Sequence, residues 1–378
     1  MEEESAMRST RTYRMGELFA GPGGIAVGAH KALKDPALFR RVAIKHAWAN
    51  DYDADTVRTY FGAVREYDPS LRRNDVIHAD VRKLDIDALS DIDGFAFGFP
   101  CNDYSLVGER KGIAGDFGPL YSYGVKVLEA KQPEWFVAEN VGGIRSHEET
   151  FRQILLELEA AGPGYELTTH LYRFEEYGVP QKRHRVIIVG IRKDLGKRFR
   201  VPAPTTPERD DQVTAAEALD GIHPSAPNHE KTRHSPSVVR RLSQIQPGQN
   251  AWNADLSEDS RINVKGATLS QIYKRLKPNE PSYTITGSGG GGTSGYHWEE
   301  PRALTNRERA RLQTFDDHHR FEGGTLSVKK QVGMAVPPKG AQVIFEALFK
   351  TLEGIPYDSV PAALSRGGAR TRGRNRDS

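Results

Sequence analysis

The chain has 378 residues, which suits one large domain and a smaller one. It carries no apolar run long enough to span a membrane, and Met1-Glu2-Glu3-Glu4 is acidic where a signal peptide would be basic, so we expect a cytoplasmic protein. The net charge of +3 neither requires nor excludes nucleic acid, whereas a single cysteine, Cys101, excludes an internal disulfide and a multi-thiolate zinc site. The histidine spacing suggests no metal site, so no metal is expected.

Short apolar runs alternate with amphipathic segments in the first half of the chain. We expect strands at Arg14–Phe19, Val42–Trp48, Val76–Ala79, Gly94–Phe99, Trp135–Ala138, Glu166–Tyr172 and Val186–Ile191, with helices that include Leu120–Lys131 and Glu148–Ala161. This alternation predicts an α/β fold with a doubly wound, mostly parallel sheet. A turn alone separates the last two strands, so they could pair antiparallel at one edge.

The composition changes near residue 199. A proline-rich linker begins at Val201, and the polar region that follows is weakly periodic to about Trp298. It includes a glycine run from Gly287 that is typical of a flexible loop. Helical patterns return at Thr305–Thr314 and Lys339–Leu352, and the tail Ser365–Ser378 carries five arginines, a composition that predicts disorder.

The segment Glu17–Gly24 closes the first strand and opens the first helix. Glycines there let the backbone turn sharply and approach a ligand, although a tight turn without a ligand is the alternative. Asp51 and Asp80 end the next two strands, where carboxylates can bind a ribose diol and an adenine amino group. Each could instead be a helix cap. No phosphate-binding lysine motif follows, which favours an adenosine ligand without a pyrophosphate.

Cys101 follows the fourth strand directly, at the edge of the sheet where ligands bind. A lone cysteine is commonly a small buried hydrophobe. Here Gly98 and Pro100 precede it and indicate a rigid, exposed turn. A thiol in such a turn can become a reactive thiolate, so Cys101 is a candidate nucleophile.

The segment Gly98-Phe99-Pro100-Cys101-Asn102 resembles the catalytic loop of DNA cytosine-5 methyltransferases. Further blocks that resemble this family follow its order, at Phe19–Gly24, Gly115–Tyr121, Glu139–Val141, Gln181–Arg185, Arg307–Phe315 and Gln331–Pro338. The resemblance spans most of the chain. It implies a Rossmann-like methyltransferase fold with a catalytic domain at 12–196, a target-recognition domain at 197–322, a returning segment at 323–360 and a disordered basic tail at 361–378.

The resemblance also implies a reaction. S-adenosylmethionine would donate a methyl group to carbon 5 of a cytosine flipped out of duplex DNA, leaving S-adenosylhomocysteine, with no metal. Cys101 would attack carbon 6, Glu139 would meet the N3 edge of the base, and Arg183 and Arg185, alternating on one strand face, would hold the base and the Cys101 loop. The loop Gly108–Gly118 would close over the DNA.

The remaining site residues are carried over in the same way. The cofactor would be bound by Phe19, Ala20, Gly21, Gly23, Gly24, Asp51, Tyr52, Asp80, Val81, Pro100, Leu120, Met334 and Ala335. Candidate DNA contacts are Ser105, Arg110, Lys111, Arg233, Arg240 and Arg241. The helical pattern from Arg307 to Phe315 is expected to organise the smaller domain.

Three positions depart from the usual family pattern. Asn102 replaces a glutamine, Asp316-Asp317 replace a proline, and Met334 replaces an asparagine that commonly helps to hold the cofactor. An RNA-directed (tRNA) relative and a catalytically silent DNA-binding regulator are the alternatives. We expect a monomer that acts on double-stranded DNA, alone or beside a restriction endonuclease without a stable complex. The sequence names neither the recognised site nor the group that removes the carbon-5 proton.

Overall fold

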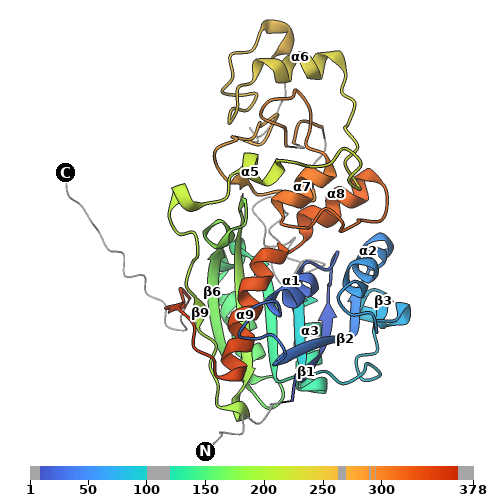
Figure 1. Ribbon diagram of the computed structural model, residues 1–378, viewed down its shortest axis with the longest axis vertical. Coiled ribbons are helices and arrows are strands. Elements are labelled where there is room, and N and C mark those ends of the chain that lie inside the picture. The colour runs from blue at the N-terminus through green and yellow to red at the C-terminus, as the bar shows by residue number, and fades with distance from the viewer. Residues whose placement is uncertain (1–8, 100–119, 263–269, 289–290, 294, 365–378) are drawn as a thin grey trace, which may run out of the picture.

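The computed structural model describes residues 9–99, 120–262, 270–288, 291–293 and 295–364. Its central feature is a seven-stranded sheet in the lower part of Figure 1. The strands are β1 (Arg11–Leu18), β2 (Val42–Asp51), β3 (Val76–His78), β4 (Gly94–Gly98), β5 (Trp135–Val141), β6 (Tyr165–Arg173) and β8 (His184–Arg192). All seven predicted strands are confirmed, within a few residues at their ends.

The sheet has the order β3-β2-β1-β4-β5-β8-β6. The strands from β3 to β5 pair in parallel, whereas β8 runs antiparallel to both β5 and β6. The expected antiparallel pair is confirmed, and β8 lies inside the sheet with β6 at the edge. The strand direction therefore reverses between β5 and β8.

Helices cover both faces of the sheet, as a doubly wound fold requires. One face is covered by α1 (Gly24–Ala32), α2 (Ala54–Arg65) and α9 (Pro338–Glu353), and the other by α3 (Tyr121–Lys131) and α4 (Glu148–Ala160). The interior strand β4 is therefore apolar at nearly every position. Phe95 and Phe97 stack with their ring centres 4.9 Å apart. The α/β prediction is confirmed.

The region that contains α5 (Ala215–Leu219) and α6 (Pro236–Gln244) extends above the sheet in Figure 1. It has small hydrophobic clusters of its own, and α7 (Asn306–Leu312) and α8 (Thr325–Met334) lie between it and the sheet. The pair of β10 (Ser282–Tyr283) with β7 (Gln181–Lys182) connects it back to the lower part. A second short pair, β11 (Ser359–Val360) with β9 (Val201–Pro202), lies beside the sheet. The domain boundaries at 197, 323 and 361 stay a prediction.

Two features of this half differ from the sequence-based expectation. Helices α5, α6 and α8 were not expected, although α6 is amphipathic and begins with Pro236, a residue favoured at the first position of a helix. Gly287 does not begin an open loop. Its backbone packs on α8 so closely that a Cβ atom added to Gly333 would lie 1.9 Å from the Gly287 nitrogen, a contact that only glycine allows.

No helix within the described residues is both long and apolar enough to cross a membrane.

Candidate active site

The loop between β1 and α1 is shaped by backbone conformations that favour glycine. Gly21 and Gly23 have φ angles of 58° and 89°, and Phe19 adopts a φ of 54°, which is unusual for a residue with a side chain. Gly24 packs against the carbonyl of Val336, where a Cβ atom would lie 2.1 Å from the oxygen. An added Cβ at Gly21 would meet no described atom within 4 Å, so the loop faces open space there. The loop is therefore a tight turn, and its open side at Gly21 leaves room for a ligand.

Asp51 fixes this loop from the end of β2. Its two carboxylate oxygens accept hydrogen bonds from the backbone N–H groups of Gly21 and Asp53, each at 3.0 Å. Burial raises the pKa of Asp51, and these two hydrogen bonds oppose the rise. Asp51 therefore joins the glycine loop to the loop after β2, a structural role that the sequence did not indicate.

Asp80 follows β3 and is half-exposed. Arg82 binds its carboxylate from the side chain and from the backbone, with an Nη2–Oδ2 distance of 2.6 Å, and these bonds lower the pKa of Asp80 to about 2. Asn50 holds the strand ends together by donating to the carbonyls of Ile77 and Ala79 at 3.0 and 2.9 Å. The ends of β1, β2 and β3 thus place the glycine loop, Asp51 and Asp80 at one edge of the sheet.

The other predicted cofactor residues divide into exposed and buried groups. Tyr52 and Met334 are 56% and 58% exposed, which is high for large apolar side chains. Ala20, Val81, Leu120 and Ala335 are buried in the hydrophobic clusters. The side chains of these four residues pack in the hydrophobic clusters, and their contact with the cofactor stays a prediction.

Glu139 and Arg185 form an ion pair at the end of the central strands. The Arg185 Nε lies 2.8 Å from Glu139 Oε1, and the two side chains are only 12% and 13% exposed. Glu139 pairs in register with Gly98 of β4, and a Cβ atom added to Gly98 would lie 3.3 Å from Glu139 Oε2. The carboxylate therefore sits beside the strand end that leads, three residues later, to Cys101.

Arg183 is placed differently from the expectation. Its side chain is 1% exposed, and its guanidinium donates to the carbonyls of Ile285, Gly333 and Ala335 at 3.1, 3.1 and 2.9 Å. Through these three bonds Arg183 connects the sheet to α8 and β10. Its expected contact with the base, the phosphate or the Cys101 loop stays a prediction.

Replacing Arg183 with methionine should destabilise the protein. The substitution keeps an apolar stem but leaves three buried carbonyl acceptors without their donors, at a cost of about 3 kcal/mol. Urea unfolding followed by circular dichroism would measure the change. Arg173→Met, which removes a 58% exposed side chain, is the control, and equal midpoints for the two variants would contradict this structural role.

A buried polar chain beneath the glycine loop was missed by the sequence analysis. Glu17 of β1 is fully buried, and it accepts a hydrogen bond from the Tyr60 hydroxyl at 3.0 Å. Tyr60 also contacts His46 Nδ1 at 3.1 Å, and His46 contacts His30 at 3.0 Å. Burial raises the pKa of Glu17 to about 8 and lowers the pKa values of His46 and His30 to about 3 and 4. An acidic residue inside an apolar strand was the only signal in the sequence.

Glu17→Gln should change how stability depends on pH. A raised folded-state pKa means that the folded protein binds the proton more tightly, so wild-type stability should fall as pH rises from about 5 to 8 and level off above it. Glutamine keeps an oxygen for Tyr60 without this penalty. Urea midpoints should therefore diverge with rising pH in favour of Glu17→Gln, and parallel curves would refute the assignment.

The predicted DNA contacts of the upper region have different environments. Arg233 and Arg240 are exposed, whereas Arg241 is half-buried, donates to the Ser260 carbonyl at 2.7 Å and lies 4.9 Å from the Tyr273 ring centre. Arg241 thus supports the fold of this region. Arg233 and Arg240 remain proposed DNA contacts.

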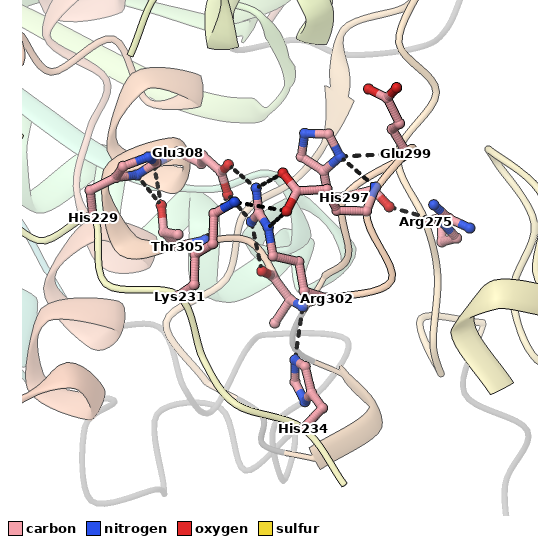
Figure 2. Close-up of polar contacts among 11 residues, drawn as sticks. His229, Lys231, His234, Arg275, His297, Glu299, Arg302, Thr305 and Glu308 are labelled. Carbon is pink, nitrogen blue, oxygen red and sulfur yellow. Dashed lines mark hydrogen bonds and ion pairs between the residues drawn. The ribbon is translucent and has the colours of Figure 1, made fainter. Parts of the chain in front are cut away.

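A buried cluster of charged residues organises the same region. Arg302 donates to Glu308 at 2.7 and 2.8 Å, a contact drawn in Figure 2. It also donates to both carboxylate oxygens of Glu300 at 2.9 Å. Arg275 is also buried, and it donates to the carbonyls of His297 and Leu242. Arg307 is fully buried and donates to three carbonyls, which agrees with the structural role expected for the helical segment from Arg307 to Phe315.

Several predicted residues lie outside the described residues. These are Pro100, Cys101, Ser105, Arg110 and Lys111, together with the rest of the loop Gly108–Gly118. Their roles stay predictions.

Comparison with known proteins gives the family. The model of the C-5 cytosine-specific DNA methylases matches residues 13–350. The Type II methyltransferase M.BbvI of Brevibacillus brevis is 55% identical over 356 residues, covering 92% of this chain and 94% of that protein. M.NgoFVII of Neisseria gonorrhoeae, also a Type II methyltransferase, is 38% identical over 335 residues, covering 85% of this chain and 83% of that protein.

Solved structures agree on the fold. A candidate DNA modification methyltransferase encoded within an E. coli prophage superposes with a TM-score of 0.67 at 21% identity, covering 90% of this chain and 99% of that one. The family model and the Type II relatives identify the chain as a DNA (cytosine-5)-methyltransferase. The chain belongs to the C-5 cytosine-specific DNA methylase family.

Proposed function

We propose that this enzyme uses S-adenosylmethionine to methylate carbon 5 of a cytosine flipped out of double-stranded DNA, through a covalent bond between Cys101 and carbon 6. The observation that carries the proposal is the Glu139–Arg185 pair, 2.8 Å apart and nearly buried beside the end of β4. That strand continues into the only cysteine of the chain. A nucleophile and an acid beside one strand end are what the chemistry of cytosine requires.

The residues at the ends of β1, β2 and β3 fit an adenosine-containing methyl donor. The glycine loop is open at Gly21, the Tyr52 ring is exposed, and Asp51 and Asp80 bring carboxylates to the same edge. In this proposal Tyr52 stacks on adenine, Asp51 faces the ribose and Asp80 meets the adenine amino group. When bound, the donor supplies a methyl group activated by its sulfonium. We propose no metal, because this activation makes a Lewis acid unnecessary.

In this proposal Cys101 and Glu139 act on different atoms of the cytosine. The Cys101 thiolate forms a bond to carbon 6, and the electron pair of the 5,6 double bond becomes available at carbon 5, which takes the methyl group. In its carboxylic-acid form Glu139 donates a hydrogen bond to N3, where negative charge would otherwise accumulate. Arg185 holds the Glu139 carboxylate in place. A base or a water molecule then takes the carbon-5 proton, the electron pair of that C–H bond re-forms the 5,6 double bond, and Cys101 leaves as a thiolate.

The region of residues 197–322 is proposed to recognise the target, with exposed Arg233 and Arg240 contacting phosphates or guanine edges. The segment at 323–360 returns to the catalytic domain, and the loop Gly108–Gly118 closes over the DNA. Because two relatives are Type II methyltransferases, we propose that the enzyme protects DNA from a restriction endonuclease. We propose that it acts as a monomer, without a stable complex with that endonuclease, in the cytoplasm.

Bisulfite sequencing of host DNA after expression tests this function. Methylated cytosines should appear within one recurring sequence, which would also identify the target. Purified enzyme with a labelled methyl donor should modify duplex DNA in preference to tRNA. Modification of tRNA alone would favour the RNA-directed alternative, and no modification of either would favour a silent regulator.

A further inference from the structure

Lys330 connects α8 to the loop after β2. Its Nζ donates a hydrogen bond to the Tyr52 hydroxyl at 2.7 Å and lies 3.7 Å from Asp53 Oδ2. The hydrogen bond to Tyr52 raises the pKa of Lys330. Residues almost 280 positions apart in the sequence thus meet at the proposed cofactor edge.

The ammonium of Lys330 lies at the edge of the Tyr52 ring and does not cover a face. Its Nζ is 5.0 Å from the ring centre but only 2.7 Å from the phenol oxygen, so it sits beyond the hydroxyl. The ring is 56% exposed. Lys330 therefore restrains the ring and leaves its surface available for stacking.

The backbone around both residues is held firmly. His78 Nε2 lies 3.0 Å from the Tyr52 carbonyl oxygen. On the other side, Gln331 accepts a hydrogen bond from the Thr59 hydroxyl of α2 at 2.7 Å and donates to the Glu322 carbonyl at 2.8 Å. The main chain of α8 is thereby fixed on α2. The remaining freedom at this edge belongs to the side chains of Tyr52 and Lys330.

Met334 lies one helical turn beyond Lys330, on the same side of α8. Its side chain is 58% exposed. The Lys330 main chain and the Met334 side chain both pack against Gly287, since a Cβ atom added there would lie 2.6 Å from the Lys330 carbonyl oxygen and 3.1 Å from Met334 Cγ. This side of α8 is therefore an exposed rim beside Tyr52.

We propose that Lys330 is a positioning residue for the methyl donor, which orients the Tyr52 ring so that the adenine stacks on it. This inference rests on the proposed function. A planar purine gains most from an aromatic ring whose orientation is already fixed, because binding then loses less side-chain freedom. Exposed ion pairs add little to stability, so the effect should appear in cofactor binding and leave the fold unchanged.

Calorimetric titration with S-adenosylhomocysteine tests the proposal without requiring turnover. Lys330→Met should bind about five- to tenfold more weakly, the scale expected when binding must immobilise one side chain, Tyr52, that is no longer held in place. Tyr52→Phe keeps the ring but loses the same bond, so its Kd should rise similarly. Lys330→Arg keeps a cationic donor and should recover most of the affinity.

The double variant separates positioning from general damage. Lys330→Met with Tyr52→Phe should bind no more weakly than either single variant, because both remove one interaction. Lys34→Met, at an exposed lysine in the turn after α1, is the charge-matched control and should bind like the wild type. Thermal melts and duplex DNA affinity should be unchanged in all of them.

The outcomes distinguish this inference from the proposed function. Wild-type affinity in Lys330→Met, or additive losses in the double variant, would overturn the role of Lys330 alone. A wild-type protein that binds neither S-adenosylhomocysteine nor S-adenosylmethionine would overturn the proposed function itself.

Discussion

Cys101→Ala is expected to lose methyl transfer by about 10⁴-fold or more, as when the nucleophile of a covalent mechanism is removed. Alanine cannot form the bond to carbon 6, and no other thiol exists in the chain to replace it. Duplex DNA binding should persist, because it depends on basic side chains elsewhere. A radiolabelled methyl-transfer assay and a gel-shift titration would measure the two properties separately.

A mechanism-based trap gives the matching positive result. With a duplex that contains 5-fluorocytosine, the fluorine cannot leave as a proton does, so the covalent adduct should persist through denaturing electrophoresis. Because the chain has one cysteine, a thiol adduct has a single possible origin. Undiminished turnover by Cys101→Ala, or formation of the adduct by this variant, would contradict the covalent mechanism.

Arg185→Ala should reduce kcat by about 100-fold, within the range that a positioned acid contributes. The side chain holds Glu139 through a 2.8 Å contact in a nearly buried setting, so its loss leaves that carboxylate without the partner that orients it. Lysine should restore little activity, since an ammonium does not reproduce the planar guanidinium. Single-turnover kinetics would isolate this step from product release.

The control for Arg185 is Arg173→Ala at the end of β6. Arg173 is 58% exposed and pairs with Glu176 one turn away, so kcat should not change. Affinity for S-adenosylhomocysteine should also be normal in Arg185→Ala. A rise in KM with unchanged kcat would assign Arg185 to substrate binding and contradict its action through Glu139.

The sequence predicted the sheet well because parallel strands are buried on both faces and appear as continuous apolar runs. It predicted the smaller region poorly. There a buried ion pair between Arg302 and Glu308 and buried arginines such as Arg307 organise the chain, and charged residues inside a fold do not produce a hydrophobic period.

The site was predicted as a set of positions but not as a set of contacts. The sequence placed Asp51 and Asp80 at neighbouring strand ends, which the structure bears out. It could not show that Arg183 turns inward to three carbonyls, nor that Lys330 reaches Tyr52, because both depend on where α8 packs. Local sequence patterns do not indicate which distant segments of the chain come into contact.

The final helix has a consequence for biosynthesis. Phe349 of α9 stacks on Tyr13 of the first strand with ring centres 5.7 Å apart, and Phe345 packs on Trp135 of β5. Part of one side of the sheet is therefore covered by a helix that is translated after all seven strands of the sheet. The nascent chain must keep this apolar surface uncovered until α9 has been translated, so we expect premature termination before α9 to yield aggregating product, which chaperones would have to retain.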